Sequence, residues 1–525
     1  MCGIVGIVGA AASEAGLRDM LGRIAHRGDP DGGGQRWVGP GAALGANRLA
    51  IVDPAGGRQP FRSPDGAVSV FNGEIYNHEE LRAELMETWR FRSTCDSEVV
   101  LAAWSRWGDG MLHRLRGMWA LAIYDPTTGA LVLARDPLGI KPLYVAEQWG
   151  TTWFGSELKA FTGLPAAEIQ SLPPGAIRRD GVRRYWCLPP FATGPHGVEA
   201  EREVAAALLD GVRSHLPAPG VPLACLLSGG IDSSTVVTLA SRLHAGPVEA
   251  WTLAAPGAPS ADLAAARELC AHLGVPLRVV SPSVEELGEH YLRQGVRMVE
   301  TWEPALVRNA VSYHFLCRAV RGAGHKLALS GEGADELFGG YDYLRPMGPA
   351  EREEAIRASL SEVHRTYLQM ADRASMAATL EVRVPFLDAR VVERCVPLPP
   401  EARYRDGTNK WALRAAFPEW IPPSIRARAK IGMNGGAGYG SNDPGEGIYH
   451  QVVAARYAAE PTHHARDLDL ATTLGTRFGV DVGNCEELHN FARFVEAGFH
   501  RLAGSERRPR LNVSPGRAAS RSELP

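Results

Sequence analysis

The chain has 525 residues, a formal net charge of −3 at pH 7, 45% hydrophobic residues and 22% charged residues. This length exceeds the roughly 100–200 residues of one typical domain, so we expect two or three hydrophobic cores. The composition excludes wholesale disorder, collagen-like chains and coiled coils. Because the charge is nearly balanced, neither nucleic acid nor a membrane is predicted as a partner, and a small-molecule enzyme is favoured.

The eight cysteines lie far apart, the closest pair being Cys187 and Cys225, which excludes CxxC and zinc-finger spacings. This spacing indicates a reducing compartment. The apolar N-terminal stretch has no Lys or Arg before Arg18, so a secretory signal is not predicted. No run of about 18 apolar residues predicts a membrane span. We therefore expect a cytoplasmic protein.

The first 160 residues alternate short apolar runs with turn signals, a pattern typical of strands. Helical spacing appears at His78–Trp89 and Ser97–Trp107, with acidic residues near each start. An α+β domain is therefore predicted. The segment Ser171–Pro190 is dense in proline, glycine and arginine, which predicts a linker.

From Glu201 onward, predicted helices alternate with strands at Val221–Leu227, at VEAWTLAA and at Lys326–Leu329. Such alternation implies parallel βαβ units. The predicted domains cover residues 1–190 and 200–504. Residues 505–525 lack periodicity and are rich in Pro, Ser and Arg, so we expect disorder there, with nucleic-acid binding by this tail as the weaker alternative.

Lysine is scarce among the 56 basic residues, since only five are present: Lys141, Lys159, Lys326, Lys410 and Lys430. A retained lysine can mark a place that needs a compact charge instead of a planar guanidinium. For any one of them, chance survival in an arginine-rich composition is the favoured interpretation.

Cys2 follows the initiator methionine, so removal of Met1 would place a free α-amino group beside the thiol. An α-amine, with a reference pKa of about 7.7–8.0, can take the thiol proton and return it at neutral pH. This pairing predicts a nucleophile that needs no histidine. From position alone, a small buried residue at the start of a strand is the alternative.

Several further segments follow MCGI along the chain in this order: AHRG, NRLAIVD, FNGEIYN, STCDSE, ARDPLGIKPLY and GSELKA. Together they resemble the glutaminase domain of class II amidotransferases. The resemblance assigns glutamine contacts to Arg48, Ile51, Val52, Asn72, Gly73, Glu74 and Asp96. Arg48 would hold the carboxylate, Asn72 and Gly73 would donate to the oxyanion, and Glu74 with Asp96 would receive the α-ammonium. Taken singly, Asn72–Gly73 is typical of a hairpin turn and Asp96 of a helix N-cap.

One departure from that family lies at HRGDPDGGG, where the family has HRGPD. One residue is inserted between Gly28 and Pro30. We expect the loop over the glutamine pocket to differ in shape or mobility, which bears on the efficiency of glutamine hydrolysis.

The segment Ser228–Ser234, SGGIDSS, follows an apolar strand and precedes a helix. A strand, a glycine turn and a helix start form an anion cradle, because unpaired N–H groups and the helix dipole face the ligand. The segment lacks a Walker lysine and resembles the SGGxDS loop of ATP pyrophosphatases. A serine-capped glycine turn is the alternative.

A second cluster, Ser330–Glu336, follows the third predicted strand. Paired carboxylates near a pyrophosphate usually serve Mg²⁺, and Asp232 with Asp335 are the candidate ligands. For Glu336, an acidic helix N-terminus is an alternative.

From Cys2 to about Gly440 the chain resembles the glutamine-hydrolysing asparagine synthetases, because it also carries DRASMAATLEVRVPFLD, NKWALR and RAKIGMNGGAG. The resemblance implies that Glu332 deprotonates the incoming ammonia and that Lys430 stabilises the departing pyrophosphate. It implies ATP contacts at Leu226, Ser228, Gly229, Gly230, Asp232, Ser233, Ser234, Leu253, Ser330 and Gly331. It also implies an internal ammonia tunnel near the strand Met118–Ile123.

Departures from this family cluster at the acceptor pocket. A threonine pair before an arginine is replaced in Glu303–Arg308, although Arg308 itself is kept for the acceptor or pyrophosphate. A polar segment after Lys430 becomes Ile431–Gly438. Because recognition of a polar substrate depends on such groups, acceptor selectivity is expected to differ.

The predicted fold is an α+β Ntn-type glutaminase sandwich followed by an α/β parallel-sheet ATP-pyrophosphatase domain of the adenine-nucleotide α-hydrolase-like type. The predicted reaction is ATP- and Mg²⁺-dependent amidation of a small carboxylic acid, with aspartate leading and a specialised acid second. A cyclase resembling β-lactam synthetase and a non-enzymatic scaffold are both less favoured. The expected partners are glutamine, ATP and the acceptor, and a homodimer is also considered.

Overall fold

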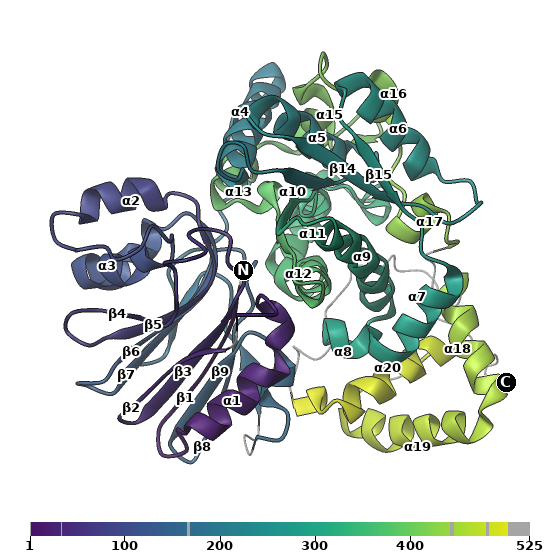
Figure 1. Cartoon of the computed structure of the whole chain (residues 1–525). Helices are drawn as coiled ribbons and strands as arrows, with labels where there is room; N and C mark the ends of the chain where they lie inside the picture. Colours follow the sequence, from purple (N-terminus) through teal and green to yellow (C-terminus); the bar gives the residue numbers. More distant parts are fainter. Residues whose placement is uncertain (1, 33, 165–167, 442–445, 479–481, 502–525) are drawn as a thin grey trace.

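The computed structural model describes residues 2–501 except 33, 165–167, 442–445 and 479–481. The predicted disordered tail, residues 505–525, lies outside the described residues. Figure 1 shows two halves, one built on antiparallel strands and the other on a parallel sheet, with further helices at the C-terminal end. None of the described helices is long and apolar enough to cross a bilayer.

The N-terminal half contains two six-stranded antiparallel sheets. The first has the order β10-β8-β9-β1-β3-β2 and consists of β1 (Cys2–Val8), β2 (Gln35–Gly39), β3 (Ala42–Arg48), β8 (Tyr144–Gln148), β9 (Thr151–Gly155) and β10 (Ile169–Ser171). The second has the order β12-β11-β7-β6-β5-β4 and consists of β4 (Phe61–Arg62), β5 (Val68–Ile75), β6 (Gly117–Asp125), β7 (Ala130–Arg135), β11 (Ala176–Arg178) and β12 (Val182–Arg184). Helix α1 (Glu14–Arg23) packs on the first sheet, and α2 (His78–Leu85) and α3 (Glu98–Trp107) cover the second.

Alternating side chains explain why the strands are apolar throughout. In β6, Ala120 and Ala122 enter the core between the two sheets, whereas Trp119 and Leu121 enter the core under α2 and α3. Successive residues of a strand point to opposite faces, so a sheet covered on both sides needs apolar residues at both. The four layers of an Ntn-type sandwich follow from this pattern.

The segment Ser171–Pro190, which was predicted as a linker, contains the strands β11 and β12. Both strands extend the second sheet. Ile177 is buried in β11, which pairs with β7. The prolines and glycines that suggested a linker instead form the turns around these short strands.

The second half is built on a five-stranded parallel sheet of order β15-β14-β13-β16-β17. Its strands are β13 (Leu223–Leu226), β14 (Val248–Leu253), β15 (Leu277–Val280), β16 (Leu327–Leu329) and β17 (Glu381–Arg383). Three of them were predicted. The short strands β15 and β17 were missed because neither has a long apolar run.

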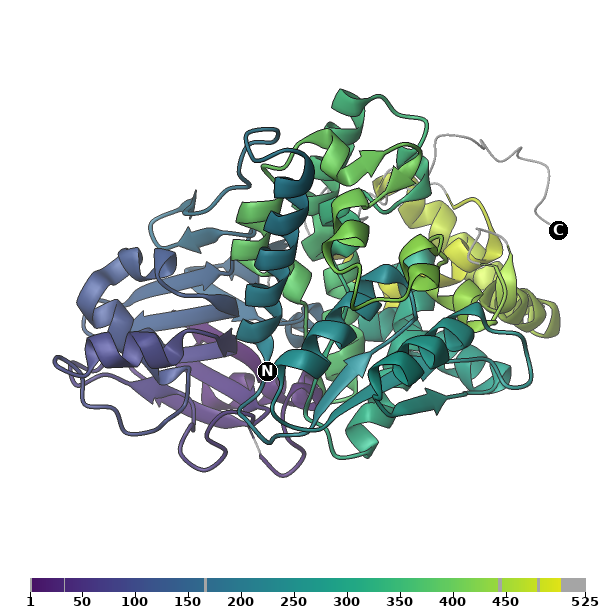
Figure 2. The same cartoon turned by 90° about the horizontal axis from the view of Figure 1, so that it is seen from above.

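Helices cover both faces of this sheet, as parallel strands require (Figure 1 and Figure 2). They are α4 (Gly197–His215), α5 (Ile231–Leu243), α6 (Ala261–Leu273), α7 (Val284–His290), α8 (Val296–Val299), α9 (Pro304–Gly322), α10 (Ala334–Phe338), α11 (Pro349–Glu362), α12 (Tyr367–Ala377), α13 (Ala389–Cys395), α14 (Pro400–Arg403), α15 (Trp411–Ala416), α16 (Pro423–Ala427) and α17 (Met433–Ala437). A small hairpin joins β18 (Tyr404–Arg405) to β19 (Thr408–Asn409). The last helices are α18 (Gly447–Ala459), α19 (Pro461–Phe478) and α20 (Cys485–Glu496).

Candidate active sites

Cys2 opens the central strand β1 and pairs in register with Arg48 at the end of β3. Its backbone N–H donates to Asn72 Oδ1 over 3.0 Å, while Asn72 Nδ2 is buried with no hydrogen-bond partner among the described residues. Leaving a buried donor unpaired costs about 1–3 kcal/mol, so this N–H is available to a developing oxyanion. Burial raises the pKa of the Cys2 thiol, which therefore needs a nearby base.

Gly73 follows Asn72 in β5 with φ +149°. A Cβ atom there would meet Met118 O at 2.0 Å and Trp119 Cα at 2.7 Å, so only glycine fits against β6. This close approach holds the segment that carries both predicted oxyanion donors beside Cys2.

The small cavity at Cys2 brings together most of the predicted glutamine contacts. It is lined by Cys2, Arg48, Ile51, Val52, Gly73, Glu74 and Asp96, together with Leu49, Gln59, Phe71, Cys95 and Ser97. Its volume is about 20 Å³, enough for one water molecule, so glutamine requires the loop after β3 to open. In the described conformation Arg48 donates to the backbone oxygens of Val52, Asp53 and Pro54 within that loop.

Two buried carboxylates face the same cavity. Glu74 is 6% exposed and Asp96 is 4% exposed. Burial, followed by the charge of Asp96, raises the pKa of Glu74 well above its ordinary value. A bound ammonium would relieve the repulsion between these groups, which suits a pocket for the α-ammonium of an amino acid.

Arg383 of β17 crosses from the second half to this pocket. Its guanidinium lies 3.3 Å from Glu74 and donates to Glu381 over 2.6 Å. Ile51, Val52 and Glu74 also line a cavity of about 1270 Å³ between the two halves, together with Lys326 and Arg383. The Cys2 cavity therefore adjoins the interface between the halves.

A buried ionic network ties the Cys2 strand to the second half. Arg27 is fully buried; its Nε donates to the backbone oxygen of Cys2 over 3.1 Å, and its NH1 donates to Glu157 over 2.6 Å and to Asp372 over 2.8 Å. Asp372, on α12, also accepts from Lys141 and Arg373. These positive charges hold the pKa of Asp372 well below its ordinary range.

Replacing Asp372 by asparagine is expected to loosen the link between the two halves. Arg27, Lys141 and Arg373 would lose their shared negative charge, and breaking a buried ion pair costs about 3–5 kcal/mol. We expect a lower melting temperature and at least about a fivefold rise in glutamate formed per pyrophosphate released, measured in one reaction.

The control is Lys326→Gln, which removes a partly exposed ion pair between the halves, Lys326 with Asp29. It should leave the product ratio unchanged. A destabilised Asp372→Asn protein with the wild-type ratio would mean that the network is structural only.

The second site lies where β13 turns into α5. Gly229 has φ +70°, and a Cβ there would lie 2.6 Å from Ala265 Cβ on α6, so glycine allows both the turn and the packing. Ser233 Oγ accepts from the backbone N–H of Ser228 over 3.1 Å and closes the turn. The start of α5 thereby points its free N–H groups toward the adjoining cavity.

That cavity, of about 140 Å³, gathers most of the predicted nucleotide residues. The predicted residues that line it are Leu226, Ser228, Asp232, Ser233, Leu253, Ser330, Gly331, Glu332, Asp335 and Lys430. Gly229, Gly230 and Ser234 lie in the turn and the first turn of α5 without lining it.

Two lysines neutralise the carboxylates in this cavity. Lys410 Nζ lies 2.6 Å from Asp232 Oδ1 and 2.6 Å from Asp335 Oδ1, while Lys430 Nζ donates to Asp335 Oδ2 over 2.5 Å. The charges of the two lysines hold the pKa of Asp335 well below its ordinary range. Because both carboxylates contact one cationic atom, their oxygens face a common point that suits a divalent cation.

Glu332 lies on the same cavity, and burial, with the nearby Glu336 and Asp335, raises its pKa to about 8. Ionising Glu332 therefore destabilises the fold, and this cost is absent below the unfolded pKa of 4.5 and complete above about pH 8. We expect Glu332→Gln to raise the melting temperature at about pH 9 by roughly 1–3 °C and to change it little at about pH 5.

The expected rise in melting temperature is much smaller than the raised pKa of Glu332 alone would give, because Glu332 is partly exposed and solvent screens its charge. Glu351→Gln, at an exposed position on α11, is the control and should show no such pH dependence. Equal shifts of the Glu332→Gln protein at both pH values would contradict the assignment.

Comparison with known proteins assigns a family to each half of the chain. A glutamine amidotransferase domain family matches residues 1–185, and an asparagine synthase family matches residues 203–358 and 346–467. Asparagine synthetase B of Escherichia coli is 33% identical over 481 residues, covering 86% of each chain. The chain belongs to the glutamine-hydrolysing asparagine synthetase family. The rice asparagine synthetase 2 is also 33% identical, over 84% of this chain and 78% of its own.

Like Gly229, Gly230 and Ser234, Arg308 is a predicted residue that does not line the cavity. Its Nε donates to Glu486 over 2.7 Å, its NH2 makes a second contact with the same carboxylate, and it does not line the cavity among the described residues. Ser312, one helical turn later on α9, does line it. Ile431 and Met433 line it as well, in the segment where the chain departs from the family.

Several residues at these sites were missed by the sequence analysis: Arg27, Gln59, Asp372, Arg383 and Lys410. Gln59 Nε2 lies 3.6 Å from Cys2 Sγ and donates to the backbone oxygen of Phe71 over 3.0 Å. Arg27, Asp372, Arg383 and Lys410 lie within the quoted motifs AHRG, DRASMAATLEVRVPFLD and NKWALR, but no role was assigned to them, and Gln59 lies in none of these motifs.

Proposed function

We propose that the protein forms an amide from a carboxylic acid, ATP and the amide nitrogen of glutamine, with aspartate as the leading acceptor. The observation that carries the proposal is that one chain holds a Cys2 pocket and a nucleotide pocket, each surrounded by the groups its chemistry requires. The names of the relatives, asparagine synthetases that hydrolyse glutamine, support the same reaction.

In the first half, the thiolate of Cys2 attacks the glutamine amide carbonyl after Met1 has been removed. The α-amino group takes the thiol proton and returns it to the leaving ammonia. Asn72 Nδ2 and the N–H of Gly73 donate to the oxyanion, and each such donor contributes about 3–4 kcal/mol to lowering the barrier. Water then releases glutamate from the thioester.

In the second half, the acceptor carboxylate attacks the α-phosphorus of ATP, and the bond to the β-phosphate breaks. The products of this step are an acyl-adenylate and pyrophosphate. Lys430 neutralises the departing pyrophosphate while the turn Ser228–Ser234 holds phosphate oxygens. Ammonia then attacks the acyl carbon, Glu332 takes its extra proton, and AMP leaves.

Mg²⁺ fits the same pocket, with Asp232 and Asp335 as its ligands. When bound, the ion would neutralise the phosphate charge and orient the pyrophosphate as leaving group. Lys410, which bridges the two carboxylates over 2.6 Å to each, would then pair with phosphate or with one of the two.

A less polar carboxylic acid is the second candidate for the acceptor, after aspartate. Ile431 and Met433 line the pocket, and the guanidinium of Arg308 is held by Glu486. The pair with Glu486 engages Nε and NH2 of Arg308, and these two atoms would turn to the acceptor or the pyrophosphate only if the pair opens. Internal cyclisation is disfavoured, because Arg48, Ile51, Val52, Gly73, Glu74 and Asp96 line the Cys2 cavity and Asn72 accepts a hydrogen bond from the backbone N–H of Cys2.

The proposed amidotransferase domain covers residues 1–190, and the proposed synthetase domain covers residues 200–504. All eight cysteines are free, which supports the proposal of a cytoplasmic, reducing environment. A homodimer stays a prediction, and the molar mass of the purified protein in solution measures it.

The test is to incubate the purified protein with glutamine, ATP, Mg²⁺ and aspartate, and to measure glutamate, pyrophosphate, AMP and amide together. Equal amounts of pyrophosphate, AMP and asparagine are expected. Amide formed only with another acid from a panel would retain the chemistry and change the acceptor. Pyrophosphate without any amide would support cyclisation, and no pyrophosphate with any acid would overturn the proposal.

A further inference from the structure

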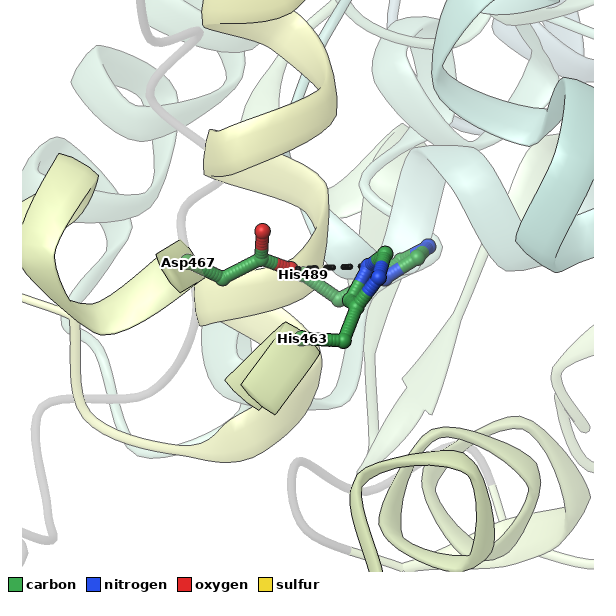
Figure 3. A group of neighbouring side chains, drawn as sticks. All are labelled: His463, Asp467 and His489. Atoms are coloured by element: carbon green, nitrogen blue, oxygen red, sulfur yellow. Dashed lines mark ion pairs between the residues drawn. The ribbon is translucent and has the colours of Figure 1, made fainter. Parts of the chain in front are cut away.

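A cluster of metal-binding side chains lies outside both proposed active sites. Figure 3 shows His463 and Asp467, from α19, converging with His489, from α20. One ligand atom from each residue lies within 4.8 Å of the other two. The spacing of four residues places His463 and Asp467 on one face of α19, which packs against α20.

His489 is the unexplained member of this cluster. Its side chain is 1% exposed, and neither ring nitrogen makes a hydrogen bond of ordinary geometry in the part of the chain that the structure describes, although the backbone of Leu292 approaches the ring. Leaving a buried polar group unpaired costs about 1–3 kcal/mol. A neutral imidazole keeps a lone pair that can bind a metal ion. A metal ion would satisfy this nitrogen.

The carboxylate of Asp467 is held in place from outside the cluster. Arg493 donates to Oδ1 over 2.6 Å, and Tyr457 donates to Oδ2 over 2.9 Å. Oδ2 lies 3.5 Å from His463 Nε2 and faces the histidines. Such outer contacts orient metal ligands in proteins.

The surrounding charges set limits on the affinity of the cluster. Arg493 and Arg466 both contact Asp467, and both also pair with Glu496. The charges of the two arginines and the two carboxylates therefore cancel before any metal binds. A bound divalent cation would add positive charge that no further carboxylate neutralises. We expect an affinity of about micromolar, weaker than that of a closed structural zinc site.

We propose that His463, Asp467 and His489 form a Zn²⁺ site that joins α19 to α20. Two imidazoles and one carboxylate suit Zn²⁺ better than Mg²⁺ or Ca²⁺, which prefer oxygen ligands, and water would take the fourth position. Tetrahedral zinc ligands lie about 3.3–3.5 Å apart, so the side chains need to move inward by about 1 Å. The His463–Asp467 pair already has this spacing.

The experiment uses the full chain after removal of metals with a chelator, followed by dialysis against a Zn²⁺ buffer and measurement of bound zinc. Wild type is compared with His463→Gln, His489→Gln and the control His272→Gln, an exposed histidine on α6. We expect both cluster variants to bind one zinc equivalent fewer than wild type, and the control to bind the wild-type amount.

His463→Gln is the deciding variant, because its side chain is 15% exposed and its replacement leaves the buried core intact. X-ray absorption measures the wild-type ligand set, and the difference from His463→Gln should show nitrogen and oxygen at about 2.0–2.2 Å without sulfur at about 2.3 Å. Equal zinc content in wild type and a folded His463→Gln protein would overturn the proposal. So would sulfur in the difference signal, which would place the ion on cysteine.

Discussion

Replacing Cys2 by alanine is expected to abolish glutamine-dependent amide formation while leaving ammonia-dependent formation intact. The thiol is the nucleophile of the first half, and removing a nucleophile costs at least about 10³-fold in rate. The nucleotide pocket is lined by residues of other elements, among them β13, α5, β14, α9 and α10, and Cys2 does not line it. The measurement is amide formed with glutamine or with an ammonium salt at equal ATP and acceptor.

Cys95 supplies a matched control, because it lines the same small cavity as Cys2. Burial, with the charge of Asp96, raises the pKa of Cys95 to about 12, so its thiol is unreactive at neutral pH. Cys95→Ala should retain glutamine-dependent activity within about threefold. Loss of both activities in a folded Cys2→Ala protein would contradict the division of labour between the two halves.

Replacing Asp232 by asparagine is expected to have the opposite effect. The variant should lose pyrophosphate formation by at least about 10²-fold, because the predicted Mg²⁺ ligand is gone and Lys410 loses a partner that it contacts over 2.6 Å. Glutamine hydrolysis should remain, since Asp232 lies outside the Cys2 cavity. Pyrophosphate and glutamate are measured in parallel.

Asp342→Asn is the control for this substitution, because Asp342 is exposed and pairs only at the surface with Arg345. It should leave both products at the wild-type level. An Asp232→Asn protein that releases pyrophosphate at the wild-type rate would exclude Asp232 from the nucleotide chemistry.

The parts of the fold that the sequence predicted are those with repeated local patterns. The strands at Val221–Leu227 and Lys326–Leu329 appear as β13 and β16, within one or two residues at each end. Strand β17 was missed because Glu381 and Arg383 are charged, and their burial is compensated by their mutual ion pair and by the contact of Arg383 with Glu74. Such pairing depends on residues brought together by the fold, so no hydrophobic periodicity in the sequence marks the strand.

The lysines also show that sequence patterns do not reveal the pairing partners of charged residues. Chance survival was the favoured interpretation of each, yet all five form ion pairs: Lys141 with Asp372, Lys159 with Glu157 and Glu300, Lys326 with Asp29, Lys410 with Asp232 and Asp335, and Lys430 with Asp335. Three of these partners lie more than 150 residues away in sequence, at Asp372, Asp29 and Asp232. Composition could flag the lysines, but only the folded chain supplies their partners.

Arg308 shows where a resemblance alone is insufficient. The residue type is kept, but its neighbour Glu486 comes from α20, beyond the segment on which the resemblance rests. A side chain can therefore match a family position and still face a different partner, because the partner is set by tertiary packing.

The ionic network around Arg27 also determines how the two halves could be recombined. Asp372 and Arg383, both in the second half, complete the surroundings of Cys2 and Glu74 in the first. A chimera that joins this amidotransferase half to an unrelated synthetase would remove Asp372, one of the two carboxylates that pair with Arg27, and leave Glu157 beside the guanidinium. A functional chimera must therefore keep both Asp372 and Arg383 at the interface between the halves.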